Sequence, residues 1–461
     1  WAPYDETLEE WLPRVPANGP LVEKAQALSI LDISVVRVYQ DGSSSEYIHQ
    51  AFKLLSEEAK DQVAKVRTSG EILKLRTLTA EGESLEPVAA LSGGNYVMPG
   101  MLPGAHTEFA YVVDKPNARG VHYRHGPFFF QDFNYRQSFL LSRLVYILPP
   151  GLDSDIVTTA FDQASDTNGI VKVMRSDKTL DDGTRVVTFE SNNAGRIQSE
   201  RAMPHYTGYV PSTRMRPKKT WKDIERALRI YSRQATALTP ELRATAAEAT
   251  GELADPIEKA RALYNHVNEV VTKDTGSSIA IRVLLEKSGN RTFLFKALLD
   301  AAGVPSRWAF LRRDENLERK TDWEYPSNTY FRAPHILLEP TGKQPLYISL
   351  QYRDLPFGFL PEFFSKGKAL VLDQGGSRIV DLPSIPAEVY ESATRATWTL
   401  GEDVAVDVNF VMETKAAQGW MQKDRFSNLN AFQMTLMTSG LATQLFPGAK
   451  VEKGGFIGIN D

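Results

Sequence analysis

Residues 288–311 constrain the fold more than any other stretch of this 461-residue chain. Apolar residues recur at helical spacing over residues 291–301 and leave almost no polar face; the repeat is Phe293, Leu294, Ala297, Leu298 and Ala301. A helix that is apolar on all sides must be enclosed by other elements, so a domain has to form around it. Asn290 is placed to cap its start and Gly303 to end it, before a strand at residues 308–311.

The order of turn, buried helix, Ala-Gly-Val-Pro and strand resembles the core of the transglutaminase-like domain, which belongs to the papain-like cysteine-protease superfamily. In that family a cysteine stands at the N-terminus of the buried helix, where unpaired N–H groups and the helix dipole stabilise a thiolate. Arg291 occupies this position here, and the chain contains no cysteine. Because arginine stays protonated in proteins, it cannot act as the nucleophile.

The resemblance also places the other two members of the family's catalytic triad. His335, within residues 333–340 (APHILLEP), matches the family's histidine on a strand after the helix. Ser349 stands where the family has an aspartate, counted back from residues 355–361 (LPFGFLP). The triad positions are therefore Arg291, His335 and Ser349, with both the nucleophile and the acid lost. We expect a degenerate domain that is not an enzyme.

The alternative is an enzyme with a site rebuilt around His335, such as a peptidase or an acyl-transferase. Thr292 adjoins the lost cysteine position, and Asp354 is an acid five residues beyond Ser349. Helix geometry disfavours Thr292, because one step along a helix turns the side chain by about 100°. A working enzyme needs a nucleophile within hydrogen-bond reach of His335 in an open cleft.

Arg291 poses a second question, because a cation at a helix N-terminus opposes the helix dipole. We expect an internal ion pair that fills the former active site, with Glu339 or Asp354 as the partner. The alternative is an anion-binding groove, whose candidate residues are Asn290, Thr292, Trp308, Glu339 and Asp354. Trp308 is expected to pack in the core beside the helix.

The preceding part of the chain alternates with a period of two, which is typical of β-strands. Asp41-Gly42 is a hairpin signal between two strand-like runs, and residues 107–113 (TEFAYVV) form a further strand. These features, with Pro103-Gly104 before His106, resemble a β-rich domain of unknown function that precedes transglutaminase-like domains in bacterial envelope proteins. We predict an antiparallel β-sandwich over residues 28–215.

The predicted fold class is therefore α+β with several domains. Residues 1–27 are predicted to be a linker or the end of a preceding helical region. Residues 216–385 form the transglutaminase-like domain, and residues 386–461 begin a further β-based domain. Basic residues gather on the first helix of the central domain, including Arg229 and Arg233. Acidic neighbours favour a solvated helix face, and the alternative is a patch that binds an anion or a partner.

Composition excludes several classes of function. A net charge of −4 gives no reason to expect nucleic acid as a partner, and no apolar run reaches the ~20 residues that span a bilayer. No spacing of histidines or glycines indicates a metal, phosphate or other cofactor site. The function most consistent with the sequence is a non-catalytic scaffold that binds a protein partner. The resemblance implies the periplasm or the surface of a bacterial cell.

Overall fold

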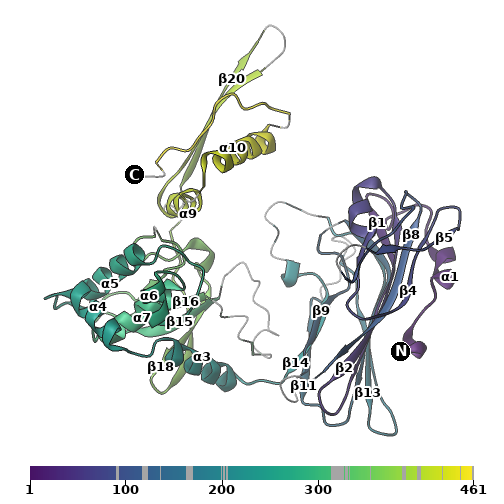
Figure 1. The fold of residues 1–461 in the computed structure, drawn as a ribbon, viewed down its shortest axis with the longest axis horizontal. Coiled ribbons are helices and arrows are strands. Elements are labelled where there is room, and N and C mark those ends of the chain that lie inside the picture. The colour runs from purple at the N-terminus through teal and green to yellow at the C-terminus, as the bar shows by residue number, and fades with distance from the viewer. Residues whose placement is uncertain are drawn as a thin grey trace. The chain divides into compact units, whose positions relative to one another are not determined.

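The computed structural model describes residues 1–89, 93–116, 123–134, 136–161, 170–198, 200, 203, 206–312, 326–327, 331, 333–353, 355–386, 391–401, 406–427, 429–446 and 448–458. The described residues up to Lys219 form one compact unit, and those from Thr220 onward form another (Figure 1). The chain is therefore a multidomain protein of mixed α and β structure.

The first unit is organised around one large sheet with the strand order β12-β13-β10-β1-β2-β8-β4-β5 in the part of the chain that the structure describes. Its strands are β1 (Ala27–Val38), β2 (Ser44–Leu54), β4 (Glu71–Leu78), β5 (Ser84–Leu85), β8 (His106–Lys115), β10 (Gln137–Leu148), β12 (Met174–Thr179) and β13 (Arg185–Ala194). Every residue of β1 except Arg37 is buried, so both faces of the sheet are covered at this strand.

One pair of strands departs from the predicted antiparallel arrangement. Strand β1 runs parallel to β10, with Ala27 opposite Gln137, although it is antiparallel to β2 on its other side. A parallel pair requires a long connection, which the many residues between β1 and β10 provide. The prediction of a purely antiparallel domain is therefore wrong at the centre of the sheet.

Two small sheets complete the β structure of the first unit in the described residues. One has the order β11-β14-β9 and consists of β11 (Ser154–Thr159), β14 (Ser212–Pro217) and β9 (His125–Phe129). The other has the order β3-β7-β6 and consists of β3 (Lys65–Arg67), β7 (Asn95–Val97) and β6 (Val88–Ala89). A short helix, α2 (Lys60–Val63), precedes β3.

The first residues of the chain are part of the first unit, whereas residues 1–27 were predicted to be a linker or the end of a preceding helical region. Helix α1 (Leu8–Trp11) inserts Leu8 and Trp11 into the same apolar core as Leu28 and Ile30 of β1. Polar contacts hold the segment as well, because the Tyr47 hydroxyl donates to Asp5 at 2.7 Å. A helix that packs on its own domain and a helix within a linker can have the same spacing of apolar residues. The sequence therefore did not distinguish these two structures.

The second unit is built on a fully antiparallel sheet with the strand order β17-β16-β15-β18-β19 among the described residues. These strands are β15 (Arg307–Arg312), β16 (Ala333–Leu338), β17 (Leu346–Ile348), β18 (Lys368–Asp373) and β19 (Gly376–Asp381). Because β15 is antiparallel to both of its neighbours, its first residues lie beside the last residues of β16 and β18. Arg307 is opposite Leu337, and Trp308 is opposite Leu372.

Helices precede this sheet and pack around one central helix. They are α3 (Trp221–Ala235), α4 (Pro240–Thr250), α5 (Pro256–Val270), α6 (Ala280–Glu286) and α7 (Arg291–Ala301). Helix α7 packs against α4, α5, α6 and β16. Thr220 and Asp223 cap the start of α3 reciprocally, and Asp255 caps α5. The positions of α7 and β15 agree with the prediction from residues 288–311.

The last described part of the chain contains a β-hairpin and two helices. The hairpin joins β20 (Ser392–Leu400) to β21 (Val406–Thr414), and α9 (Ala416–Phe426) and α10 (Ala431–Leu445) follow. Phe359 packs edge-on against Trp420, with 5.4 Å between the ring centroids. Residues 386–461 were predicted to begin a further β-based domain; their described residues cluster with the second unit, and a boundary near residue 386 stays a prediction. No helix among the described residues is long and apolar enough to cross a bilayer.

We predict that Leu8→Ala destabilises the first unit by about 2–5 kcal/mol, because Leu8 is fully buried. Hydrogen exchange of the β1 and β2 amides during urea unfolding would measure the change. Leu102→Ala is the matched control, because Leu102 is 61% exposed and its truncation should cost less than about 0.5 kcal/mol. Equal effects of the two variants would mean that the first residues are a linker after all.

Candidate functional site

Helix α7 carries the position at which the resemblance expects a nucleophile. Nine of its eleven residues are buried, including both of its cations, Arg291 and Lys296. Asn290 caps the helix by accepting a hydrogen bond from the Thr292 backbone N–H at 3.1 Å. Phe293 contacts the ring of Trp308 at 4.8 Å between centroids, so Trp308 packs beside this helix as predicted.

Arg291 is locked into the interior by groups on the preceding helix and loop. Its side chain is 2% exposed, and it forms an ion pair with Asp274. It also donates to the Asn268 side-chain oxygen at 3.3 Å. A buried arginine is therefore compensated from α5 and from the loop that follows α5, and it lies where a thiolate would stand in the family.

The predicted partner Glu339 is wrong, because this carboxylate pairs with two other arginines. Arg307 forms an ion pair with Glu339, and Arg378 donates to it at 2.8 Å. Glu339 directly follows β16, next to the start of β15, and this long-range neighbourhood is set by strand pairing. The other candidate partner, Asp354, lies outside the described residues.

The loop between α5 and α6 covers the start of α7. The Gly289 backbone N–H donates to the Lys273 carbonyl, and the Asn290 N–H donates to the Ser277 carbonyl, each at 2.9 Å. Gly289 has φ of +127°, and a Cβ atom there would collide with the Ser277 carbonyl oxygen. Only glycine permits this close approach, so the first turn of α7 is enclosed by the chain itself.

His335 lies in β16 and is held as a neutral ring. It is 1% exposed, and its Nδ1–H donates to the Ala333 carbonyl at 3.1 Å. Burial lowers the pKa of His335 to about 4, because the charged ring would lose its hydration. Phe364 contacts the ring edge-on at 4.9 Å between centroids. The Nε2 atom has no hydrogen-bond partner among the described residues.

The register of the sheet separates His335 from α7. His335 is opposite Ala309, while its neighbour Ile336 is opposite Trp308. Successive side chains of a strand point to opposite faces, and Trp308 faces α7 through its contact with Phe293. His335 therefore faces the other side of the sheet, where Ala309 and Phe364 belong to one apolar core.

The three predicted triad positions are not brought together by the described structure. Arg291 and Thr292 lie on α7, on one side of the sheet, and His335 points to the other side. Ser349 is buried after β17, and its hydroxyl accepts a hydrogen bond from the Gln351 backbone N–H at 3.3 Å. Among the described residues no hydrogen bond joins any two of these side chains, so the geometry assembles no catalytic dyad from them.

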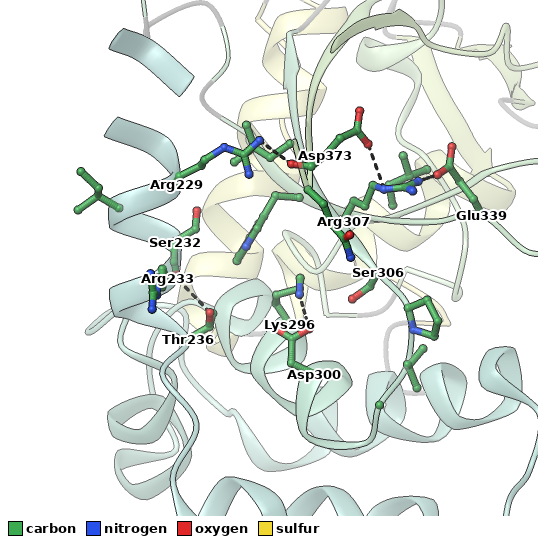
Figure 2. Close-up of a pocket in the computed structure, with 18 residues that line it drawn as sticks. Arg229, Ser232, Arg233, Thr236, Lys296, Asp300, Ser306, Arg307, Glu339 and Asp373 are labelled. Carbon is green, nitrogen blue, oxygen red and sulfur yellow. Dashed lines mark hydrogen bonds and ion pairs between the residues drawn. The ribbon is translucent and has the colours of Figure 1, made fainter. Parts of the chain in front are cut away.

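A cavity of about 960 Å³ opens elsewhere in the second unit, at the end of the sheet where β15 begins (Figure 2). Its walls come from the second half of α3, the second half of α7, the loop before β15, and the last residues of β16 and β18. The polar side chains lining it are Arg229, Ser232, Arg233, Thr236, Lys296, Asp300, Ser306, Arg307, Glu339, Asp373 and Gln374. Cavities of this size are typical of ligand sites.

A charge network builds one wall of this cavity. Figure 2 shows Arg307 between Asp373 and Glu339, and its Nε donates to Asp373 at 3.0 Å. Arg378 contacts the same two carboxylates, at 2.9 and 2.8 Å. Arg229 of α3 donates to the Asp373 carbonyl oxygen at 2.5 Å and pairs with Glu225 at 2.8 Å. These contacts fix α3 against the end of the sheet.

Most of this cavity was not predicted from the sequence. Trp308 and Glu339 were candidate groove residues, but they line the end of the sheet and not the start of α7. Arg229 and Arg233 were assigned to a solvated helix face, with an anion- or partner-binding patch as the alternative, and both line the cavity. The available signal was the pair Lys296 and Asp300, since charges in the second half of a mostly apolar helix must face a polar space or each other.

Comparisons with known proteins find a solved structure with a similar fold, but they assign the chain to no family. The crystal structure of a putative protease from Parabacteroides distasonis resembles the chain with a TM-score of 0.55 at 14% sequence identity. The match covers 78% of this chain and 72% of that protein. No protein-family model and no curated protein sequence matches the chain. At this identity the likeness shows the arrangement of elements alone.

We predict that the second unit loses stability as the pH falls from about 6.5 to about 4. Above this window the His335 ring is neutral in both states, but within it only the unfolded chain binds the proton. The unfolded state is thereby favoured, by roughly 3 kcal/mol at the acid end. Urea unfolding followed by hydrogen exchange of the β15 and β16 amides would measure this loss.

His335→Asn is the matched control for the pH dependence, because asparagine can still donate to the Ala333 carbonyl but does not titrate. The stability difference between wild type and variant should shrink as the pH falls. A difference that is constant between pH 8 and pH 4.5 would show that His335 is not buried as a neutral ring.

Proposed function

We propose that this chain is a non-catalytic binding protein built on a degenerate transglutaminase-like domain. The observation that carries the proposal is Arg291, a buried and ion-paired arginine at the position where the family holds its cysteine. Arginine cannot act as a nucleophile, and the chain has no cysteine that would replace it.

The surroundings of the former nucleophile position also support the proposal. The first turn of α7 is enclosed by the loop at residues 272–279, so a substrate would have to displace this loop to reach it. His335 faces the opposite side of the sheet and is packed against Phe364. A general base has to reach the proton that it removes, and this histidine has no open path to α7.

The proposed setting is the bacterial cell envelope, where the protein would serve as an interaction scaffold in the periplasm or at the cell surface. The support is the order of a β-rich unit followed by a transglutaminase-like unit, which resembles the arrangement in bacterial envelope proteins. A bacterial protein is also among the structures with a similar fold. The cavity at the end of the sheet gives such a scaffold a place to bind a partner.

The second candidate function is a peptidase with a rebuilt site. It is favoured by one observation, the fold likeness to a protein described as a putative protease. At 14% identity this likeness does not extend to chemistry. A rebuilt peptidase would also need a hydroxyl beside the buried Nε2 atom of His335, and none is hydrogen-bonded to it among the described residues.

We predict that the purified protein does not react with a fluorophosphonate probe and does not cleave denatured casein. The physical reason is that no hydroxyl is hydrogen-bonded to the His335 ring among the described residues, so none is activated by it. Mass spectrometry of the probe-treated protein would detect a labelled serine or threonine. Labelling that is lost in both His335→Ala and Thr292→Ala would support the peptidase instead.

A thiol placed at position 291 gives a second test of the same geometry. We expect Arg291→Cys to react with iodoacetamide roughly tenfold or more slowly than Arg226→Cys, because position 291 is buried and no imidazole lowers its pKa. Arg226 is an exposed residue of α3 and supplies the matched control thiol. Both variants should retain the hydrogen-exchange protection of β15.

One outcome of the thiol test would contradict the proposal. If the thiol at position 291 reacted faster than the control, and His335→Ala abolished that advantage, then the two residues would form a catalytic dyad. The non-catalytic proposal would then be wrong.

A further inference from the structure

We propose that the cavity at the end of the sheet binds a carboxylate carried by a short peptide. This inference deepens the proposed binding function, on which it rests, by naming the chemical class of the ligand. The carboxylate would be recognised by spare hydrogen-bond donors of α3 and of the loop before β15, and the peptide body by the apolar part of the cavity wall.

The described cavity has hydroxyl groups without a partner, while its carboxylates are already paired. Its three carboxylates, from Asp300, Glu339 and Asp373, are paired with Lys296, Arg307 and Arg378. The buried hydroxyl oxygens of Ser232 and Ser306 have no hydrogen-bond partner in the described structure.

Arg233 adds an unpaired cation to these two hydroxyls. It lines the cavity from an exposed position on α3, and no hydrogen bond or ion pair to a described residue is found for it. Figure 2 shows Arg233 next to Ser232 and Thr236 on the same helix. All three groups line the same cavity, so a ligand that supplies acceptors and negative charge is complementary to them.

The net charge of the described cavity wall favours an anion that carries one negative charge. The cations of the cavity and its network are Arg229, Arg233, Lys296, Arg307 and Arg378, and the carboxylates are Glu225, Asp300, Glu339 and Asp373. The excess is one positive charge. A carboxylate neutralises this excess, whereas a phosphate dianion would leave a negative charge among three nearby carboxylates.

The apolar part of the wall indicates what the carboxylate is attached to. Val304, Trp308, Leu337 and Leu372 line the interior, and Ile230 stands at the rim with 53% of its surface exposed. A lone small anion would leave these surfaces without contact. A peptide carries apolar side chains and a carboxylate on one flexible chain, so it matches both parts of the wall.

The test uses the full chain and synthetic pools of short randomised peptides, with bound peptides identified by affinity-selection mass spectrometry. One pool lacks Asp and Glu and has a free carboxyl terminus, the second is the same pool with an amidated terminus, and the third is amidated but contains one Glu. We expect retention of the first or third pool at least about tenfold above the second. The retained pool tells whether the terminus or a side chain supplies the carboxylate.

Variants of α3 connect the binding to this cavity. Arg233→Glu should weaken the retained peptides by roughly 10- to 100-fold, and Ser232→Ala by a smaller factor. Arg226→Glu makes the same charge change on the same helix but outside the cavity wall, so it should leave the affinity unchanged. Inorganic phosphate at the same concentration should not displace the peptides.

Several results would overturn the inference. They are no retention of any pool, equal retention of amidated and free peptides without acid, or equal loss in Arg226→Glu and Arg233→Glu. Recovery of retained peptides in shortened form would be a different result. It would contradict the non-catalytic function while leaving the carboxylate site intact.

Discussion

The burial of helix α7 is the constraint on which the second unit depends. Nine of its eleven residues are enclosed, and two of these nine are cations. An ion that leaves water loses several kcal/mol of solvation, so each cation needs a carboxylate or other acceptors close by. Arg291 finds them in Asp274 and Asn268, and Lys296 finds Asp300 one turn further along the helix.

The ion pairs of Arg291 and Lys296 have different consequences for function. The partner of Arg291 comes from a loop that folds back over the helix start and is fixed there by backbone hydrogen bonds, so this end of α7 is closed. The partner of Lys296 is on the same helix, and both side chains line the cavity. The half of α7 that lines a cavity is thus its second half, away from the position that the resemblance aligns with the family's cysteine.

The sequence predicted what depends on local patterns and missed what depends on strand register. The apolar repeat of residues 291–301, with Gly303 after it, was enough to place α7 and β15. The partner of Glu339 was missed because Arg307 and Arg378 approach it across strands far apart in sequence. The sequence also did not show to which face of the sheet His335 points, because this follows from the pairing of Ile336 with Trp308.

Register also explains why a single substitution would not bring the His335 ring to the α7 side of the sheet. To turn His335 toward α7, β16 would have to slip by one residue against β15. Such a slip moves every side chain of a strand to the other face. Ile336 and Leu338 would then leave the helix side, and Leu337 would leave the core that it shares with Ala309 and Phe364. Both faces of β16 are buried, so these side chains would exchange one packed environment for another, and the cost of the slip would be the repacking of both sides of the sheet. The apolar packing on both faces of β16 therefore keeps His335 on the side of the sheet away from α7.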